Sequence, residues 1–132
     1  MDTHAIRILV ADDNAAGREL MRTLLQMEDY VVYEARDGNE AVEMARRLRP
    51  DVVLMDVHMP VLDGIEATRL LREDPLTRSI PVIVLTASAT PDERRLAVRA
   101  GCVGYLFKPV DMVRFPGQLD QWLRVDQAAV AA

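Results

Sequence analysis

Short apolar runs alternate with segments of helical periodicity along the whole of this sequence. In the first helical segment, Leu20, Leu24 and Met27 recur at the spacing that places apolar side chains on one helix face. Repeated units of strand then helix predict a parallel sheet with right-handed crossovers and helices on both faces. The sequence therefore predicts a three-layer α/β sandwich, with strands at 6–11, 31–35, 52–56, 82–85 and 103–107.

The apolar runs also predict how deeply each strand is buried. Four of the five runs are nearly all apolar, which is typical of strands that are buried on both faces of a sheet. This composition predicts such burial for the first, third, fourth and fifth strands. The run 31–35 is less apolar, so we expect the second strand near an edge.

Proline and glycine indicate several helix boundaries. Pro91 suits the first turn of the fourth helix, and Gly101 suits its end. In the last helical segment, Pro116 and Gly117 interrupt the apolar pattern. A proline inside a helix removes a backbone hydrogen bond and clashes with the preceding turn, at about 3 kcal/mol. We therefore expect a loop or single turn at 111–115 and a helix that starts near Pro116.

Size and composition indicate the class of protein. The 132 residues suit one domain, with a core at 6–124 and a tail, 125–132, that we expect to be a frayed helix end. A net charge of −5 argues against nonspecific binding to nucleic acid. The lone Cys102 excludes an internal disulfide. No segment matches a signal peptide or the roughly twenty apolar residues that span a bilayer, so we expect a cytoplasmic protein without membrane contact.

Polar residues stand at the ends of four predicted strands. Asp12 and Asp13 follow the first strand, Asp56 ends the third, Thr86 follows the fourth and Lys108 follows the fifth. Because open α/β sheets bind ligands at the carboxyl edge, where parallel strands end together, we expect these side chains to converge. Lys108 is the only lysine beside fifteen arginines, which indicates a site that needs a compact ammonium instead of a broad guanidinium.

The chemistry of these residue types favours a phosphoryl group. Neighbouring carboxylates repel one another, and a hard divalent cation such as Mg²⁺ relieves that repulsion. Lys108 and Thr86 supply a positive charge and a hydroxyl donor, and a carboxylate can itself attack phosphorus. One structural alternative stays open for the aspartate pair, since Asp13 before Asn14 could cap a helix.

Several short motifs together resemble the receiver domain of two-component response regulators, the CheY-like superfamily. The resemblance implies a flavodoxin-like (βα)5 sandwich whose five parallel strands have the order 2-1-3-4-5. It covers residues 6–124, almost the whole chain. The matching residues are Asp12-Asp13, Asp56 with Met59-Pro60 and Asp63-Gly64, Thr86-Ala87, and Lys108-Pro109.

The resemblance implies a role for each residue around the acidic cluster. Asp56 would accept a phosphoryl group from a phosphohistidine. Asp13, Asp56 and the backbone carbonyl of His58 would hold Mg²⁺ or Mn²⁺, and Asp12 would contribute through water. The side chains of His58 and Ser88 would set the lifetime of the aspartyl phosphate.

It also implies roles for the residues that respond to phosphorylation. Lys108 would pair with the phosphoryl oxygens, and Thr86 would move to bond one of them. Tyr105 matches the aromatic residue that rotates inward when the threonine moves. The Lys108–Pro109 peptide bond would be cis.

The expected function is a phosphorylation-dependent signalling switch that modifies itself and turns over no other substrate. The phosphoryl donor would be a sensor histidine kinase or a histidine phosphotransfer protein. A downstream protein partner would read the face formed by the fourth helix, fifth strand and fifth helix. We expect no attached output domain, and a monomer or a phosphorylation-dependent dimer.

Two other functions fit the residues less well. A phosphatase of the haloacid-dehalogenase type would need a second aspartate where this chain has His58, and it would need a capping domain. A flavodoxin-like electron carrier would need a loop rich in serine, threonine and glycine after the first strand to hold the phosphate of FMN. The sequence has no aspartate at position 58, no capping domain and no such loop after the first strand.

Overall fold

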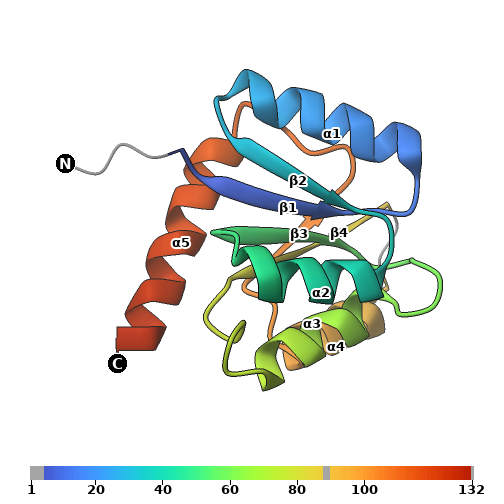
Figure 1. Ribbon diagram of the computed structural model, residues 1–132, viewed down its shortest axis with the longest axis vertical. Helices are drawn as coiled ribbons and strands as arrows, with labels where there is room; N and C mark the ends of the chain where they lie inside the picture. Colours follow the sequence, from blue (N-terminus) through green and yellow to red (C-terminus); the bar gives the residue numbers. More distant parts are fainter. Residues whose placement is uncertain (1–4, 88–89, 132) are drawn as a thin grey trace.

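The computed structural model describes residues 5–87 and 90–131, with side chains described as far as residue 123. In this part of the chain, five strands and five helices alternate (Figure 1). The strands are β1 (Arg7–Ala11), β2 (Val31–Ala35), β3 (Val52–Asp56), β4 (Val82–Thr86) and β5 (Gly104–Phe107). The helices are α1 (Ala15–Met27), α2 (Gly38–Leu48), α3 (Gly64–Glu73), α4 (Pro91–Ala100) and α5 (Phe115–Ala131).

All strands belong to one parallel sheet in the order β2-β1-β3-β4-β5. The predicted fold and strand order are confirmed. Because the strands run in one direction, their carboxyl ends lie at the same edge of the sheet. The register places Asp56 of β3 opposite Leu85 of β4, and Thr86 of β4 opposite Phe107 of β5. The polar residues that end these strands are therefore neighbours.

Two apolar layers hold the helices against the sheet. Successive side chains of a strand point to opposite faces, and β1 shows this alternation. Ile8 and Val10 pack in the cluster that includes residues of α1 and α5, whereas Leu9 and Ala11 pack in the cluster that includes residues of α2 and α3. A smaller cluster joins Ala97 of α4 to the sheet. The arrangement is the expected three-layer sandwich (Figure 1).

The strands differ in burial more than the sequence predicted. β3 and β4 are buried throughout, and β1 is buried except at Arg7. β5 is instead an edge strand with half-buried residues, and Phe107 is 55% exposed. The prediction of burial on both faces is therefore wrong for β5. Its apolar composition reflects contacts with both helical layers, which an edge strand also makes, since Tyr105 and Leu106 pack in different clusters.

Four helices begin at a side-chain cap that accepts a hydrogen bond from the amide three residues further on. Asn14 caps α1 in this way, with 2.9 Å between its Oδ1 and the amide nitrogen of Gly17. The structural alternative for Asp13 is thus wrong, and its carboxylate is available for other contacts. The other caps are Asp37, Asp63 and Thr90.

Helix α5 starts at Phe115, one residue before the predicted position. A single turn precedes it, in which Asp111 Oδ1 accepts a hydrogen bond from the amide of Val113 at 3.0 Å. Pro116 therefore stands in the first turn of the helix, where its missing N–H breaks no helical hydrogen bond. The predicted interruption is confirmed. The helix continues through Ala131, so the backbone of the tail is helical up to that residue.

None of the helices in the described part of the chain combines the length and apolar character needed to cross a membrane.

Candidate phosphoryl-acceptor site

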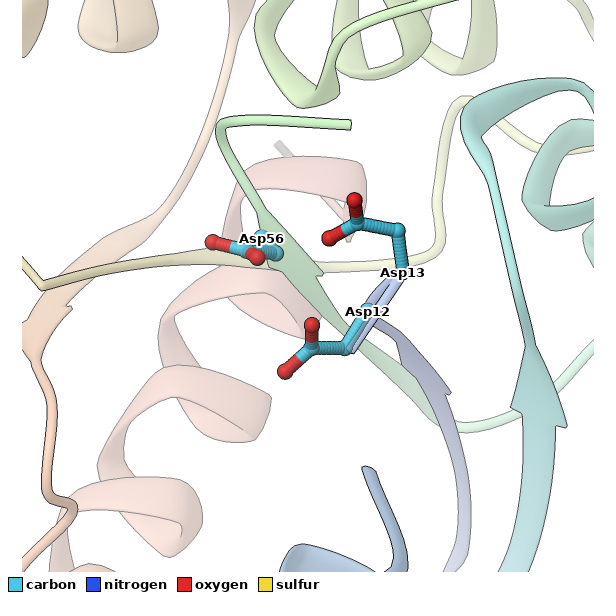
Figure 2. A group of neighbouring side chains, drawn as sticks. All are labelled: Asp12, Asp13 and Asp56. Atoms are coloured by element: carbon cyan, nitrogen blue, oxygen red, sulfur yellow. The ribbon is translucent and has the colours of Figure 1, made fainter. Parts of the chain in front are cut away.

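Three carboxylates meet at the carboxyl edge of the sheet (Figure 2). Asp12 and Asp13 directly follow β1, and Asp56 is the last residue of β3. One oxygen of each lies within 4.8 Å of the others. Asp12 and Asp56 are buried, at 5% and 8% exposure, whereas Asp13 is exposed. The structure thus brings together the residues that the sequence placed at one edge, with one carboxylate open to solvent.

Lys108 contacts two of these carboxylates. Its Nζ lies 2.9 Å from Asp12 Oδ2 and 3.3 Å from Asp56 Oδ2. The lysine follows β5, its amide donates to the carbonyl of Thr86 at 2.8 Å, and its peptide bond to Pro109 is cis. One ammonium therefore faces two buried carboxylates.

Burial and this imbalance of charge together shift the pKa values of Asp56 and Lys108. Burial raises the pKa of Asp56 above its ordinary range, Lys108 lowers it, and the Asp12 carboxylate raises it again, with a net rise. For Lys108, burial alone would lower the pKa, but the hydrogen bond to Asp12 and the charges of Asp56 and Asp12 outweigh it and raise the pKa. Lys108 therefore stays protonated. Its single positive charge compensates only one of the two buried carboxylates, so one negative charge remains partly desolvated and without a full counter-charge.

Asp12 is fixed by contacts that the sequence analysis did not identify. Its Oδ1 accepts a hydrogen bond from the amide of Asn14 at 2.9 Å. The guanidinium of Arg18 donates to the backbone carbonyl of Asp12 at 2.7 Å and also to Glu34 Oε1 at 3.2 Å. Arg18 thus joins α1, β2 and the end of β1. No motif in the sequence distinguishes this arginine from the others.

Gly64 lies directly behind Asp56. A Cβ atom at Gly64 would stand 1.9 Å from the backbone oxygen of Asp56, closer than any side chain permits. The amide of Gly64 also donates to the carbonyl of Val57 at 2.8 Å. The close approach of α3 to the end of β3 therefore requires the glycine of the Asp63-Gly64 motif, and Asp63 caps α3.

The residues expected to respond to phosphorylation share a partner, Glu93 of α4. Thr86, fully buried at the end of β4, donates its hydroxyl to Glu93 Oε1 at 3.4 Å. Tyr105 of β5 donates to the same oxygen at 3.3 Å. His58, 71% exposed, places Nε2 3.2 Å from Glu93 Oε2. Ser88 lies outside the described residues.

Sequence reasoning missed Glu93, although its position carries a recognisable pattern. Thr90 to Glu93 has the spacing of a capping box, in which the glutamate turns back to the start of its own helix. The Thr90 hydroxyl does accept a hydrogen bond from the Glu93 amide, at 3.1 Å. The carboxylate of Glu93, however, contacts side chains from three other segments.

The family model of the response regulator receiver domain matches residues 8–120. The chain belongs to the response regulator receiver family. This receiver is 34% identical over 116 residues to the polar-differentiation response regulator DivK of Brucella anthropi, a match that covers 88% of this chain and 94% of that protein.

Two solved structures show the same fold. The receiver domain of a Pseudomonas aeruginosa sensor histidine kinase, solved with a magnesium ion in its active site cleft, is 36% identical, with a TM-score of 0.84 over 91% of this receiver and 98% of that chain. Chemotaxis protein CheY4 of Vibrio cholerae is 29% identical, with a TM-score of 0.83 over 90% and 99%. The chain is therefore a receiver of two-component signalling, a family of signalling switches that binds Mg²⁺ in the active site.

Proposed function

We propose that this receiver accepts a phosphoryl group on Asp56 from a phosphohistidine and changes its binding to a partner protein as a result. The observation that carries the proposal is the position of Asp56 beside Lys108, 3.3 Å away, and beside the carboxylates of Asp12 and Asp13. This arrangement supplies a nucleophile, a cation for the phosphoryl oxygens and oxygen ligands for a metal ion.

The transfer needs few groups from the protein. A carboxylate oxygen of Asp56 attacks phosphorus and forms the O–P bond of an acyl phosphate. The P–N bond of the phosphohistidine breaks, and the imidazole leaves with the electron pair and takes up a proton. Lys108 would follow the phosphoryl oxygens as negative charge collects on them, because positioning and charge stabilisation provide most of the catalysis in phosphoryl transfer.

The donor set of the acidic cluster fits Mg²⁺ or Mn²⁺. Hard cations of this kind take one or two carboxylates together with waters and a phosphate oxygen. Asp13 and Asp56 would be direct ligands with the backbone carbonyl of His58, and Asp12, which already accepts from Lys108, would act through water. When bound, the ion would neutralise charge on the phosphoryl group. Exposure of Asp13 leaves the cluster accessible from solvent.

The donor protein would be a sensor histidine kinase or a histidine phosphotransfer protein. A largely apolar cavity of about 280 Å³ opens beside Asp12 and Lys108, and residues of α1 line it, among them Leu20, Met21 and Leu24. An apolar surface that adjoins Asp12 and Lys108 suits a protein donor, which must hold its phosphohistidine in line with Asp56. We propose no direct contact with nucleic acid.

The output would be a change of the face formed by α4, β5 and α5. Thr86 would leave its present position to bond the phosphoryl group, and Tyr105 would rotate inward. Phosphorylation would thus shift an equilibrium between two arrangements of this face. A downstream protein, or a second copy of the chain in a dimer, would bind one arrangement better. The expected cytoplasmic location stays a prediction.

Labelling by acetyl phosphate tests the proposal. The protein with Mg²⁺ should gain the mass of one phosphoryl group, and Asp56→Asn should gain none, because an amide oxygen is not a nucleophile of this kind. Asp13→Ala should block labelling through loss of a metal ligand, with partial rescue at high Mg²⁺. Asp92→Asn, at an exposed aspartate of α4, is the control and should be labelled normally.

Two results would contradict the proposal. One is labelling of the Asp56→Asn variant at another aspartate, which would refute the acceptor. The other is steady turnover of phosphate esters by the unmodified protein, which would favour a phosphatase. Substitutions at His58 and Ser88 are expected to change how long the acyl phosphate lasts and to leave Mg²⁺ affinity unchanged.

A further inference from the structure

One carboxylate contacts three side chains of this site. Glu93 Oε1 accepts hydrogen bonds from the hydroxyls of Thr86 and Tyr105, at 3.4 and 3.3 Å. Glu93 Oε2 lies 3.2 Å from His58 Nε2. The Glu93 side chain is 16% exposed, whereas the His58 side chain that it contacts is 71% exposed. A single acid of α4 therefore connects the end of β4, the middle of β5 and the loop after β3.

The position of Glu93 is set by its own helix. Its amide donates to the hydroxyl of Thr90, the cap of α4, at 3.1 Å. The next residue, Arg94, stacks over the Tyr105 ring with 5.7 Å between the guanidinium carbon and the ring centroid. The first turn of α4 thus holds both the hydroxyl and the ring face of Tyr105.

We propose that Glu93 is a positioning residue that holds Thr86 and Tyr105 in the unphosphorylated arrangement of this receiver. The inference rests on the proposed function, because it assigns Glu93 to the same switch. In this arrangement the Thr86 hydroxyl is directed to α4. After phosphorylation, the phosphoryl oxygens on Asp56 compete with Glu93 for that hydroxyl, and the inward rotation of Tyr105 would break its own bond to Glu93.

The distances indicate a weak restraint. Hydroxyl–oxygen hydrogen bonds usually measure about 2.7–2.8 Å, and both bonds to Glu93 are longer. A charged acceptor strengthens such bonds, so each still favours the resting arrangement. Burial first, and then the Glu93 carboxylate, raise the pKa of Tyr105, which keeps its hydroxyl protonated as a donor. Glu93 therefore biases the equilibrium without locking it, as a reversible switch requires.

The test compares two neighbouring acids of α4. Glu93→Ala removes the shared acceptor. Asp92→Ala removes an equally charged residue of the same turn, whose described ion pair is with the exposed Arg95. Both variants lose a favourable interaction with the helix N-terminus, so their difference reports the contacts of Glu93 with Thr86, Tyr105 and His58. Glu93→Gln keeps an acceptor oxygen of the same reach without the charge and should lie between Glu93→Ala and the unmodified protein.

Two measurements report the arrangement. The three tyrosines are replaced by 3-fluorotyrosine, and the ¹⁹F resonance of Tyr105 is identified with Tyr105→Phe. Beryllofluoride with Mg²⁺, a mimic of the acyl phosphate, gives the reference shift of the active arrangement. We expect the Tyr105 resonance of metal-free Glu93→Ala to move part of the way to that reference. Labelling by acetyl phosphate should become about fivefold faster, the effect of losing roughly one net hydrogen bond.

The outcomes separate this inference from the function on which it rests. If Glu93→Ala matches Asp92→Ala in both resonance and labelling rate, or is labelled more slowly than the unmodified protein, the role of Glu93 is refuted. If the unmodified protein is neither labelled nor shifted by beryllofluoride, the proposed function fails first. A Glu93→Ala variant that does not fold leaves the isosteric Glu93→Gln to decide, since an unchanged resonance and rate there would also refute the role.

Discussion

Replacement of Asp56 by asparagine should make the metal-free protein more stable. Asp56 is buried at 8% exposure, and the single ammonium of Lys108 is shared between it and Asp12. Its pKa is raised by burial and, less strongly, by Asp12, in spite of Lys108. The asparagine side chain would keep the shape of the aspartate and remove the negative charge that Lys108 does not fully compensate. Lys108 would keep its shorter pair with Asp12, at 2.9 Å.

The size of the effect follows from these opposing contributions. Loss of a partly compensated buried charge should raise the free energy of unfolding by about 1–2 kcal/mol. A carboxyl group whose pKa is raised by folding binds its proton more tightly in the folded state. The unmodified protein therefore gains stability as the pH falls through the raised value toward the ordinary value of 3.8, and the advantage of Asp56→Asn should shrink there.

Mg²⁺ should reverse the order of stability. At a concentration a hundredfold above its dissociation constant, a ligand of the folded state adds about 2.7 kcal/mol. The unmodified protein would receive this stabilisation, and Asp56→Asn, which lacks one ligand charge, would receive much less. The free energy of unfolding of both proteins is measured in urea, with EDTA and then with Mg²⁺. Circular dichroism and the fluorescence of the single Trp122 follow the unfolding.

The control for this comparison is Asp92→Asn, in which an exposed aspartate is neutralised. It should change the stability little and respond to Mg²⁺ as the unmodified protein does. A metal-free Asp56→Asn protein that is less stable than the unmodified one by more than about 1 kcal/mol would refute the reasoning. The Asp56–Lys108 pair would then outweigh the burial of the charge.

Other substitutions test the geometry around the site. Lys108→Arg keeps the charge but puts a broad guanidinium where a compact ammonium fits, so acetyl phosphate labelling should weaken and partner binding should no longer respond to it. Val61→Gly should stabilise the protein by about 1 kcal/mol in urea unfolding, because this exposed β-branched residue has a φ of 69°. Gly64→Ala should destabilise by about 2–4 kcal/mol, since its Cβ would meet the backbone of Asp56. Gly117→Ala, with no atom within 4 Å of the new carbon, should instead stabilise by about 0.5–1 kcal/mol; equal effects at the two glycines would contradict this account.

Most of the fold was predictable because its elements follow local rules. The strands alternate with amphipathic helices, and the start of α5 followed from the fixed geometry of Pro116. The burial of β5 was not predictable from composition, since an edge strand covered by helices is as apolar as an interior one. The strand order was predicted from the resemblance to receivers, because the apolar pattern does not determine which strands are neighbours.

The acidic cluster could be located from the sequence because each member ends a strand or comes just after one. Parallel strands place their carboxyl ends at one edge, so a position along the chain translates directly into a position in space. No such rule locates the side chains of Arg18 and Glu93. Both lie within helices, where the direction of a long flexible side chain depends on which groups the rest of the fold brings near.

Glu93 shows why such residues need a structure. The sequence pattern from Thr90 to Glu93 predicts a carboxylate that serves its own helix, and the amide of Glu93 does bond the cap. Its carboxylate, however, meets the hydroxyls of Thr86 and Tyr105 because the parallel register places Thr86 at the end of β4 and Tyr105 on the neighbouring strand. A local motif thus fixes the backbone of Glu93, and the sheet determines what its side chain contacts. Because Glu93 is held by its helix and also contacts the sheet, a change at the site can be transmitted to α4 through its hydrogen bonds with Thr86 and Tyr105.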